Sequence, residues 1–392
     1  MLGRIASPFI VSQIEVSEVK SRRDRNAFIK FPWRTYANDP AWVPPLIVER
    51  KAFLDRKRHP FYQHGDAELF LARKNGEIVG RIMASDDPNY NALHQTCVGC
   101  FGLFECVDDI DVAAALFDAA EKWLRARGRT EIMGPIDYST NYVCGLLIDG
   151  FQHPPMLLTA HNPPYYARLI EACGFVKAKD WFAWWFSEFP EPAKRLRKIA
   201  VARADRQGIK VRQVNLRDLP GESRVLQTIY NQAWEKNWGF VPMTKAEADH
   251  MAREMKPLLE PEGLLIAESD QPVAFIIAVP DINAALRKIN GRLFPTGLMK
   301  LLYYKRKIRT GRLIALGVIE KYRRTGIAEA LVLRVMDEAV MRGFTGELSV
   351  TLEDNVLVNR FIEALGAKRY KTYRIYARSI PNSFGLNRVS EY

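Results

Sequence analysis

The sequence predicts an α/β protein made of two tandem units, each a mixed sheet flanked by helices. The heptapeptide RLIEACG at residues 168–174 returns as RFIEALG at residues 360–366, 192 positions later in a chain of 392 residues. Trp42-Val-Pro44 is echoed by Trp238-Gly-Phe-Val-Pro242, and the hairpin-like segment 70–79 by the segment 265–274. A repeat this long indicates duplicated domains, because the repeats of solenoids span only about 20 to 50 residues.

The first unit is expected over residues 12–188. Asn75-Gly76 between two apolar runs is a strong hairpin signal. The amphipathic segment that ends at Gly128 is typical of a helix. The elements expected in this unit are strands at 69–73, 78–84 and 97–105, a helix at 112–127, a long irregular segment to 155, a strand at 156–159, a helix at 165–172 and an aromatic strand at 181–186.

A basic linker at 189–208 leads to the second unit at 209–380, which repeats the order of elements. Its later part predicts strands at 313–318 and 347–352 and helices at 327–342 and 356–365. The offset between the copies changes along the chain, which places an insertion of about 20 residues in each unit. One lies within 134–155 of the first unit, and the other within 281–312 of the second.

The charge and the apolar runs narrow the function classes. A formal net charge of +12 favours polyanionic partners such as coenzyme phosphates, anionic lipid or nucleic acid. No apolar run approaches the roughly 20 residues that span a bilayer, and no signal peptide is recognisable, so a cytoplasmic protein is expected. Cys97 and Cys100 have the spacing of metal ligands, but no second pair accompanies them, and no metal site is expected.

The clearest chemical signal is a basic turn between a strand and a helix. The apolar strand 313–318 runs into EKYRRTGIA at residues 320–328 and then directly into a helix. A helix N-terminus presents free backbone N–H groups and the positive end of the helix dipole to a phosphate. Gly326 and Ala328 let the backbone approach a ligand closely, and Arg323 and Arg324 add positive charge. An ordinary strand-to-helix turn is the alternative interpretation.

This turn resembles the pyrophosphate-binding motif of the GNAT superfamily of N-acetyltransferases, normally V-x-P-x-x-[RQ]-x-x-G-x-[GA]. The matching residues are Val318, Arg323, Gly326 and Ala328, and Asn355 with Leu365-Gly366 resembles the second coenzyme-binding segment. The resemblance covers Ile209–Arg378 well and Ile14–Phe186 only as a degenerate copy. It implies acyl-CoA as co-substrate and no metal. The coenzyme-binding residues that it implies are Leu316, Gly317, Val318, Arg323, Arg324, Thr325, Gly326, Ile327, Ala328, Asn355 and Asn359.

The first unit lacks the basic turn. The corresponding segment is Asp108–Ala113, whose three carboxylates suit a helix N-terminus but would repel a pyrophosphate. The first unit is therefore expected to bind no coenzyme and to act as a structural or substrate-shaping partner.

The resemblance also implies a mechanism. A splayed pair of strands would hold the pantetheine arm through backbone groups of Leu316 and Val318, and a backbone N–H would polarise the thioester carbonyl. A neutral amine would then attack, which calls for a base and an acid. The tyrosine that often supplies the acid is Ile362 here, and the strand position of a base glutamate falls near Arg312. The candidate catalytic residues are instead Glu353, Asp281, His161 and Tyr373.

The second insertion indicates the acceptor. Arg287–Arg312 carries nine Lys or Arg and no carboxylate, interleaved with large apolar and aromatic residues. Such a segment suits an anionic membrane surface, and Trp181, Trp184 and Trp185 would add an interfacial belt. A basic, coenzyme-facing loop over a core cluster is the alternative. Nucleic acid is disfavoured, because the aromatic residues come with aliphatic ones instead of a polar stacking groove.

The insertion, Gly134-Pro135 and the segment 161–166 (HNPPYY) resemble the bacterial ceramide synthases. That resemblance implies N-acylation of a sphingoid amine from acyl-CoA at the inner membrane. The sequence thus predicts an acyl-CoA-dependent N-acyltransferase with a lipid amine as acceptor, cytoplasmic and peripheral on the inner face of the membrane. Two alternatives stay open: acetyl transfer to a small soluble amine, and a non-catalytic protein that binds acyl-CoA or membranes.

Overall fold

The computed structural model describes residues 13–188 and 208–381 and has the α/β architecture that the repeat predicts. Except for Gly208, the predicted basic linker lies outside the described residues. The elements of the first unit are β1 (Ile14–Glu18), α1 (Arg22–Lys30), α2 (Pro32–Thr35), α3 (Ile47–Phe53), β2 (Asp66–Lys74), β3 (Glu77–Asp86), α4 (Pro88–His94), β4 (Val98–Cys106), α5 (Ile110–Arg125), β5 (Glu131–Gly134), β6 (Leu146–Asp149), α6 (Tyr165–Ala172) and β7 (Val176–Phe186).

The second unit repeats this order up to its last strand. Its elements are β8 (Lys210–Gln213), α8 (Leu219–Trp234), α9 (Lys245–Met255), β9 (Leu264–Glu268), β10 (Pro272–Pro280), α10 (Asn283–Leu286), α11 (Gly297–Lys305), β11 (Thr310–Val318), α12 (Ile327–Met341), β12 (Thr345–Leu352), α13 (Val356–Ala364) and β13 (Lys368–Ser379). The repeated heptapeptide forms most of α6 and the end of α13, so the internal repeat is structural. Asn75 and Gly76 both have positive φ, as the predicted hairpin turn requires.

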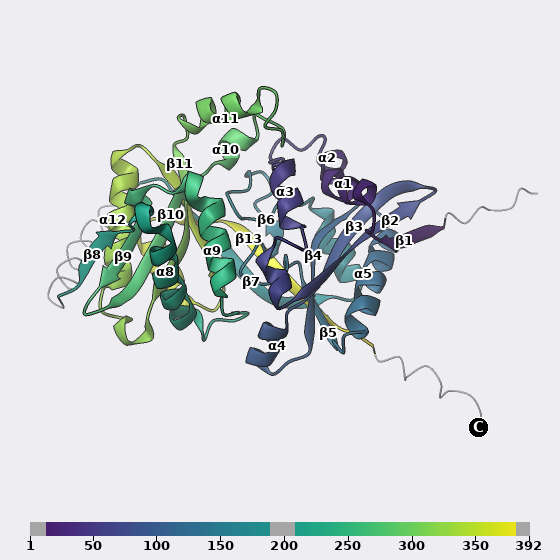
Figure 1. Ribbon diagram of the computed structural model, residues 1–392, viewed down its shortest axis with the longest axis horizontal. Coiled ribbons are helices and arrows are strands. Elements are labelled where there is room, and N and C mark those ends of the chain that lie inside the picture. The colour runs from purple at the N-terminus through teal and green to yellow at the C-terminus, as the bar shows by residue number, and fades with distance from the viewer. Residues whose placement is uncertain (1–12, 189–207, 382–392) are drawn as a thin grey trace, which may run out of the picture.

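The two units exchange their last strands. The continuous sheet runs in the order β1-β2-β3-β4-β5-β13-β7-β12-β11-β10-β9-β8, and β6 pairs with β13 beside this path. Strand β7 of the first unit therefore pairs with β12 of the second, while β13 of the second unit pairs with β5 of the first. Figure 1 shows the yellow C-terminal strand in the middle of the molecule, between the two groups of helices.

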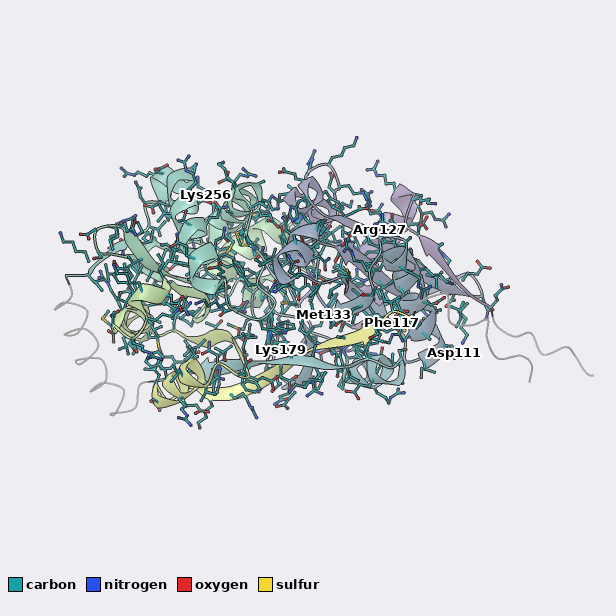
Figure 2. All side chains as sticks on the ribbon, turned by 90° about the horizontal axis from the view of Figure 1, so that it is seen from below. Asp111, Phe117, Arg127, Met133, Lys179 and Lys256 are labelled. Carbon is teal, nitrogen blue, oxygen red and sulfur yellow. The ribbon has the colours of Figure 1, made fainter. Side chains whose placement is uncertain are left out.

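The exchanged strands pair with each other and with strands of both units. In Figure 2 the labelled Lys179 of β7 and Met133 of β5 lie beside the yellow strand β13. They are in register with Ile375 and Ala377 of that strand, respectively. Because each unit completes its sheet with a strand of the other, the cavity described below has walls from both.

Helices cover both faces of the sheet (Figure 1). In the first unit, α5 and α6 bury one apolar core against the strands, and α1 and α3 bury another on the opposite face. In the second unit, α12 and α13 cover one face and α8 covers the other. Over the described residues, no helix combines the length and the apolar character that crossing a bilayer requires.

Two details differ from the sequence-based expectations. Residues 156–159 form a turn and not a strand, because Leu158 has a left-handed φ of 60° and the Thr159 N–H donates to the Met156 carbonyl (3.1 Å). The strand of this region is β6, inside the segment expected to be irregular, where the Asn162 side chain bonds both backbone groups of Leu147.

Trp184 and Trp181, two of the three tryptophans of the expected interfacial belt, lie inside the protein. Trp184 is buried in β7, a central strand of the sheet, and bonds the Thr351 hydroxyl. Trp181 on the same strand lines an internal cavity. The exchange of strands explains this placement, since it moves β7 from the edge of one unit to the middle of a common sheet.

Candidate active site

Strands β11 and β12 diverge in the second unit. They pair in parallel only from Thr310 with Thr345 to Leu313 with Leu348. Beyond these pairs β11 continues to Val318 and β12 to Leu352, so a gap opens between them toward their carboxyl ends. This is the splayed pair that the family resemblance implies. We call it the β11/β12 gap.

The backbone of β11 presents polar groups to this gap. The Leu316 carbonyl accepts a hydrogen bond from the Trp234 indole N–H of α8 (3.2 Å), so it points away from the neighbouring strand β10. In an antiparallel strand the N–H and carbonyl of one residue share a direction, so the Leu316 N–H faces the gap as well. Gly317 has a packing role, because a Cβ there would lie 2.5 Å from the Phe275 ring.

The basic turn leads directly into helix α12. Gly326 occupies the N-cap position with a left-handed φ of 90°, and Arg324 has a φ of 66°. Within the described residues no side chain caps the helix, and its first backbone bond runs from the Ala330 N–H to the Gly326 carbonyl. The N–H groups of Ile327 and Ala328 are thus available to an anion at the positive end of a 15-residue helix.

The two arginines of the turn have different surroundings. Arg323 donates to the carbonyls of Val318 (3.3 Å) and Ala233 (2.5 Å), which ties the turn to β11 and to the last turn of α8. Arg324 is exposed beside the helix N-terminus. We conclude that Arg323 holds the turn in shape, while Arg324 is positioned to add charge to an anion site. Thr325 donates its hydroxyl to the Tyr322 carbonyl (2.6 Å) and stabilises the same turn.

The corresponding region of the first unit is closed. Asp109 caps α5 by accepting from the N–H groups of Asp111 (3.0 Å) and Val112 (3.4 Å). The divergence after β4 and β5 is filled by the chain itself, since the Ile136 N–H donates to the Phe101 carbonyl (2.7 Å). A Cβ on Gly102 would lie 2.4 Å from the Ile136 carbonyl oxygen. The first unit therefore has neither the anion site nor the gap.

The second predicted coenzyme segment begins α13. Asn355 is the N-cap residue of this helix and lines the cavity described next. Asn359 is buried, where its amide donates to the Leu352 carbonyl (3.1 Å) and accepts from the Thr351 hydroxyl (2.5 Å). These bonds fix α13 to the end of β12, the strand that forms one side of the gap.

A cavity of about 540 Å³ joins the β11/β12 gap to the first unit. Its second-unit wall is mostly apolar and comes from β11, β12, α8, α9 and α13. The first-unit wall comes from α3, from His59, from Trp181 on β7, from residues 158–160 and from the loop 137–144, which is part of the predicted first insertion. Three hydrogen bonds dock this loop on the second unit: Thr140 to the Gly239 carbonyl, Tyr230 to Asn141 (2.6 Å) and Tyr142 to Glu247 (3.1 Å).

Tyr373 is the one predicted catalytic residue that lines this cavity. It lies on β13 in register with Trp181, and its buried hydroxyl lies beside the Thr159 side chain. Burial raises the pKa of Tyr373, so the phenol stays protonated and can donate.

The other three candidates lie outside the cavity lining. The Glu353 carboxylate accepts from the Asp180 N–H (3.1 Å) and from Lys177 (2.6 Å) on β7. Asp281 accepts from the N–H groups of Leu157 (3.0 Å) and Asn283 (3.3 Å), and burial raises its pKa to about 6. His161 bonds Asp39 (2.7 Å), and burial lowers the pKa of its imidazole. Each of them links segments of the fold.

Sequence reasoning missed a buried ionic cluster at the closed end of the gap. Arg312 and Glu347 face each other in the β11–β12 register and form an ion pair (2.8 Å). Tyr370 donates to the same carboxylate (2.6 Å), and the fully buried Lys371 donates to the Pro154 carbonyl (2.7 Å). Burial lowers the pKa of Lys371 to about 8. The sequence signal for this pair was that Arg312 directly precedes the predicted strand 313–318 and Glu347 begins the predicted strand 347–352.

This chain is similar to known proteins over most of its length. The model of the acetyltransferase (GNAT) family matches residues 224–367. Protein YghO of Escherichia coli (strain K12) is 37% identical over 373 residues, covering 92% of this chain and 94% of that protein. The bacterial ceramide synthase of Caulobacter vibrioides (strain NA1000 / CB15N) is 35% identical over 385 residues, covering 94% and 98%. A tandem GNAT protein from the clavulanic acid biosynthesis pathway, 11% identical, shares the fold with a TM-score of 0.58 over 95% of this chain and 100% of its own.

Proposed function

The chain belongs to the GNAT family and is an N-acyltransferase, and we propose that it transfers a long acyl chain from acyl-CoA to the amine of a lipid. The observation that carries the proposal is the apolar cavity of about 540 Å³ that continues from the β11/β12 gap. Cavities of this size hold ligands with tens of heavy atoms. An acetyl group and a small amine would leave most of it empty.

The likeness to a bacterial ceramide synthase supports a sphingoid-type amine as the acceptor. Different residues of the chain would bind the parts of acyl-CoA and donate the proton. The free N–H groups that begin α12, with Arg324, suit the pyrophosphate, and the β11 backbone suits the pantetheine arm. Tyr373 reaches the cavity as a protonated phenol, which suits donation to the departing thiolate. A neutral amine would form the amide bond as the C–S bond breaks, and the proton that its nitrogen loses would replace the one that Tyr373 gives to the thiolate.

The second insertion supports contact with a membrane. The insertion exposes apolar side chains, Phe294 (78% exposed) before helix α11 and Met299 (75%) on that helix, next to exposed cations such as Lys300 and Lys307. Large apolar side chains with flanking cations suit the interface of an anionic bilayer. The insertion is also fixed to the first unit, because Asn283 donates to the Pro155 carbonyl (2.9 Å) and Trp33 donates to Asn290 (2.8 Å).

A vesicle-binding assay tests membrane contact through α11, and a comparison of amine substrates tests the acceptor class. The double variant Met299→Glu/Leu302→Glu should lose most of its binding to vesicles of phosphatidylcholine and phosphatidylglycerol and keep its affinity for acyl-CoA. Met341→Glu is the matched control, because Met341 is equally exposed on α12, away from the insertion. Equal vesicle binding by all three proteins would contradict membrane contact through α11. Faster turnover of a soluble amine with acetyl-CoA than of any lipid amine would favour the small-substrate alternative.

A further inference from the structure

Three first-unit side chains that line the cavity carry buried polar atoms with no partner among the described residues. They are His59, through both ring nitrogens, Asn141, through its amide nitrogen, and Trp181, through its indole nitrogen. His59 is only 3% exposed. Leaving such atoms unbonded is unfavourable in a folded protein, so they indicate a bound polar group. We call these three residues the polar wall.

A chain of contacts connects the three residues of the polar wall. The Trp181 ring contacts the Trp238 ring (6.4 Å between centroids), and the next residue, Gly239, accepts a hydrogen bond from Thr140. Asn141 follows in the chain. The ring of Tyr142 then lies 5.1 Å from that of His59. The loop that closes the first unit's own gap therefore also places the wall along one side of the cavity.

The wall lies beside the β11/β12 gap. Trp181 is in register with Leu352 at the end of β12 on one side and with Tyr373 of β13 on the other. Neighbouring strands are about 4.8 Å apart, so Trp181 and Tyr373 are one and two strands from the edge of the gap. A molecule bound at the wall would thus lie next to a thioester held in the gap.

We infer that the first unit, which has no coenzyme site, binds the polar head of the acceptor amine through His59, Asn141 and Trp181. This inference rests on the proposed acyl transfer and assigns the acceptor site within it. The Trp181 and Asn141 N–H groups can only donate, so they need an acceptor on the ligand, and because the lone pair of the amine attacks the thioester, that acceptor is an oxygen. His59 is neutral, because burial, His250 and Arg50 lower its pKa to about 3, and it offers one donor and one acceptor. The ligand class is therefore a primary amine with a neighbouring hydroxyl or carbonyl oxygen.

Matched acceptors test this assignment. Hexylamine is compared with 2-aminohexan-1-ol, and hexadecylamine with 2-aminohexadecan-1-ol, using the full chain and palmitoyl-CoA. The wild-type protein should prefer the amino alcohol by about tenfold in kcat/KM, the effect of one good hydrogen bond. Trp181→Phe should reduce this preference to below about threefold while the Kd for palmitoyl-CoA stays unchanged. Tyr165→Phe is the control, since its hydroxyl bonds the Cys106 carbonyl in the same unit outside the cavity lining.

Stability provides a second readout. His59→Phe replaces an unbonded imidazole by a ring of similar shape, so it should leave Tm unchanged or higher and still raise the KM of the amino alcohol about tenfold. A large fall in Tm would show that His59 serves the fold, which would overturn its place in the wall. A weakened Kd for palmitoyl-CoA with an unchanged acceptor preference would assign the wall to the acyl donor and also overturn the inference.

The two proposals fail in different ways. Equal turnover of hexadecylamine and 2-aminohexadecan-1-ol would contradict the role of the polar wall and would agree with lipid acylation. Turnover of hexylamine and 2-aminohexan-1-ol alone, with a preference for the amino alcohol that Trp181→Phe abolishes, would support the polar wall and contradict the lipid acceptor.

Discussion

Replacing Gly326 by aspartate should abolish most of the affinity for acyl-CoA. The variant places a carboxylate at the N-cap of α12, as Asp109 does at the N-cap of α5 in the first unit. The free N–H groups of Ile327 and Ala328 would then be capped. Hydrogen bonds to a charged group contribute about 1.5 to 3 kcal/mol each, so the loss of two corresponds to at least about 3 kcal/mol, or roughly a hundredfold in Kd.

The assay is calorimetric titration with palmitoyl-CoA and, separately, with S-palmitoyl-pantetheine, which lacks the pyrophosphate. Gly326→Asp should weaken the first ligand about a hundredfold and the second by less than about threefold. Gly343→Asp is the matched control, because Gly343 also has a positive φ (69°) and follows the other end of the same helix, about 22 Å away. It should carry a similar strain of about 1 to 2 kcal/mol in unfolding and bind both ligands normally. An unchanged Kd for palmitoyl-CoA in Gly326→Asp would refute the anion site.

Three further predictions concern stability and chain length. Arg312→Leu leaves the buried Glu347 without its cation and should cost about 3 to 5 kcal/mol of unfolding free energy. Removal of the partly exposed Lys177 should cost less than about 1 kcal/mol. Equal costs in urea titrations would contradict this difference. Because the pKa of Asp281 is about 6 when folded and about 3.9 when unfolded, the folded state binds the extra proton, and this group's contribution to stability falls as pH rises from about 4 to 6. Asp281→Asn should therefore gain about 3 kcal/mol relative to wild type between pH 4 and 7, and parallel pH curves would refute the shift. Val350→Trp narrows the cavity and should move the preferred acyl-CoA to shorter chains in a kcat/KM series, while an unchanged optimum would place the acyl chain elsewhere.

The local features of the site were predictable from the sequence. The hairpin, the basic turn and the helix after it depend on short segments, in which glycine, arginine and apolar periodicity specify the backbone. The splayed strands were implied by the family resemblance. Gly326 is an example, since its left-handed φ of 90° suits glycine in that turn. The closure of the first unit was also partly predictable, because the carboxylate at Asp109 is a good helix cap.

The strand exchange was not predictable from the repeat. Similar copies show that each unit contains a last strand but not which copy that strand pairs with, since β7 and β13 present the same kind of edge to either sheet. The exchange decides which residues meet in the cavity. It brings Trp181 beside Tyr373, and it ties Glu353 to the backbone of β7 through Asp180. The unbonded atoms of His59 and Asn141 likewise become visible only once burial is known.

Product analysis tests the central claim most directly. The full chain is incubated with palmitoyl-CoA and 2-aminohexadecan-1-ol on anionic vesicles, and the amide and the free coenzyme thiol are quantified by mass spectrometry and thiol titration. The structure predicts one thiol released per amide formed, with kcat/KM at least about tenfold higher for palmitoyl-CoA than for acetyl-CoA. Amide formation from acetyl-CoA alone, or thiol release without amide, would contradict long-chain N-acyl transfer.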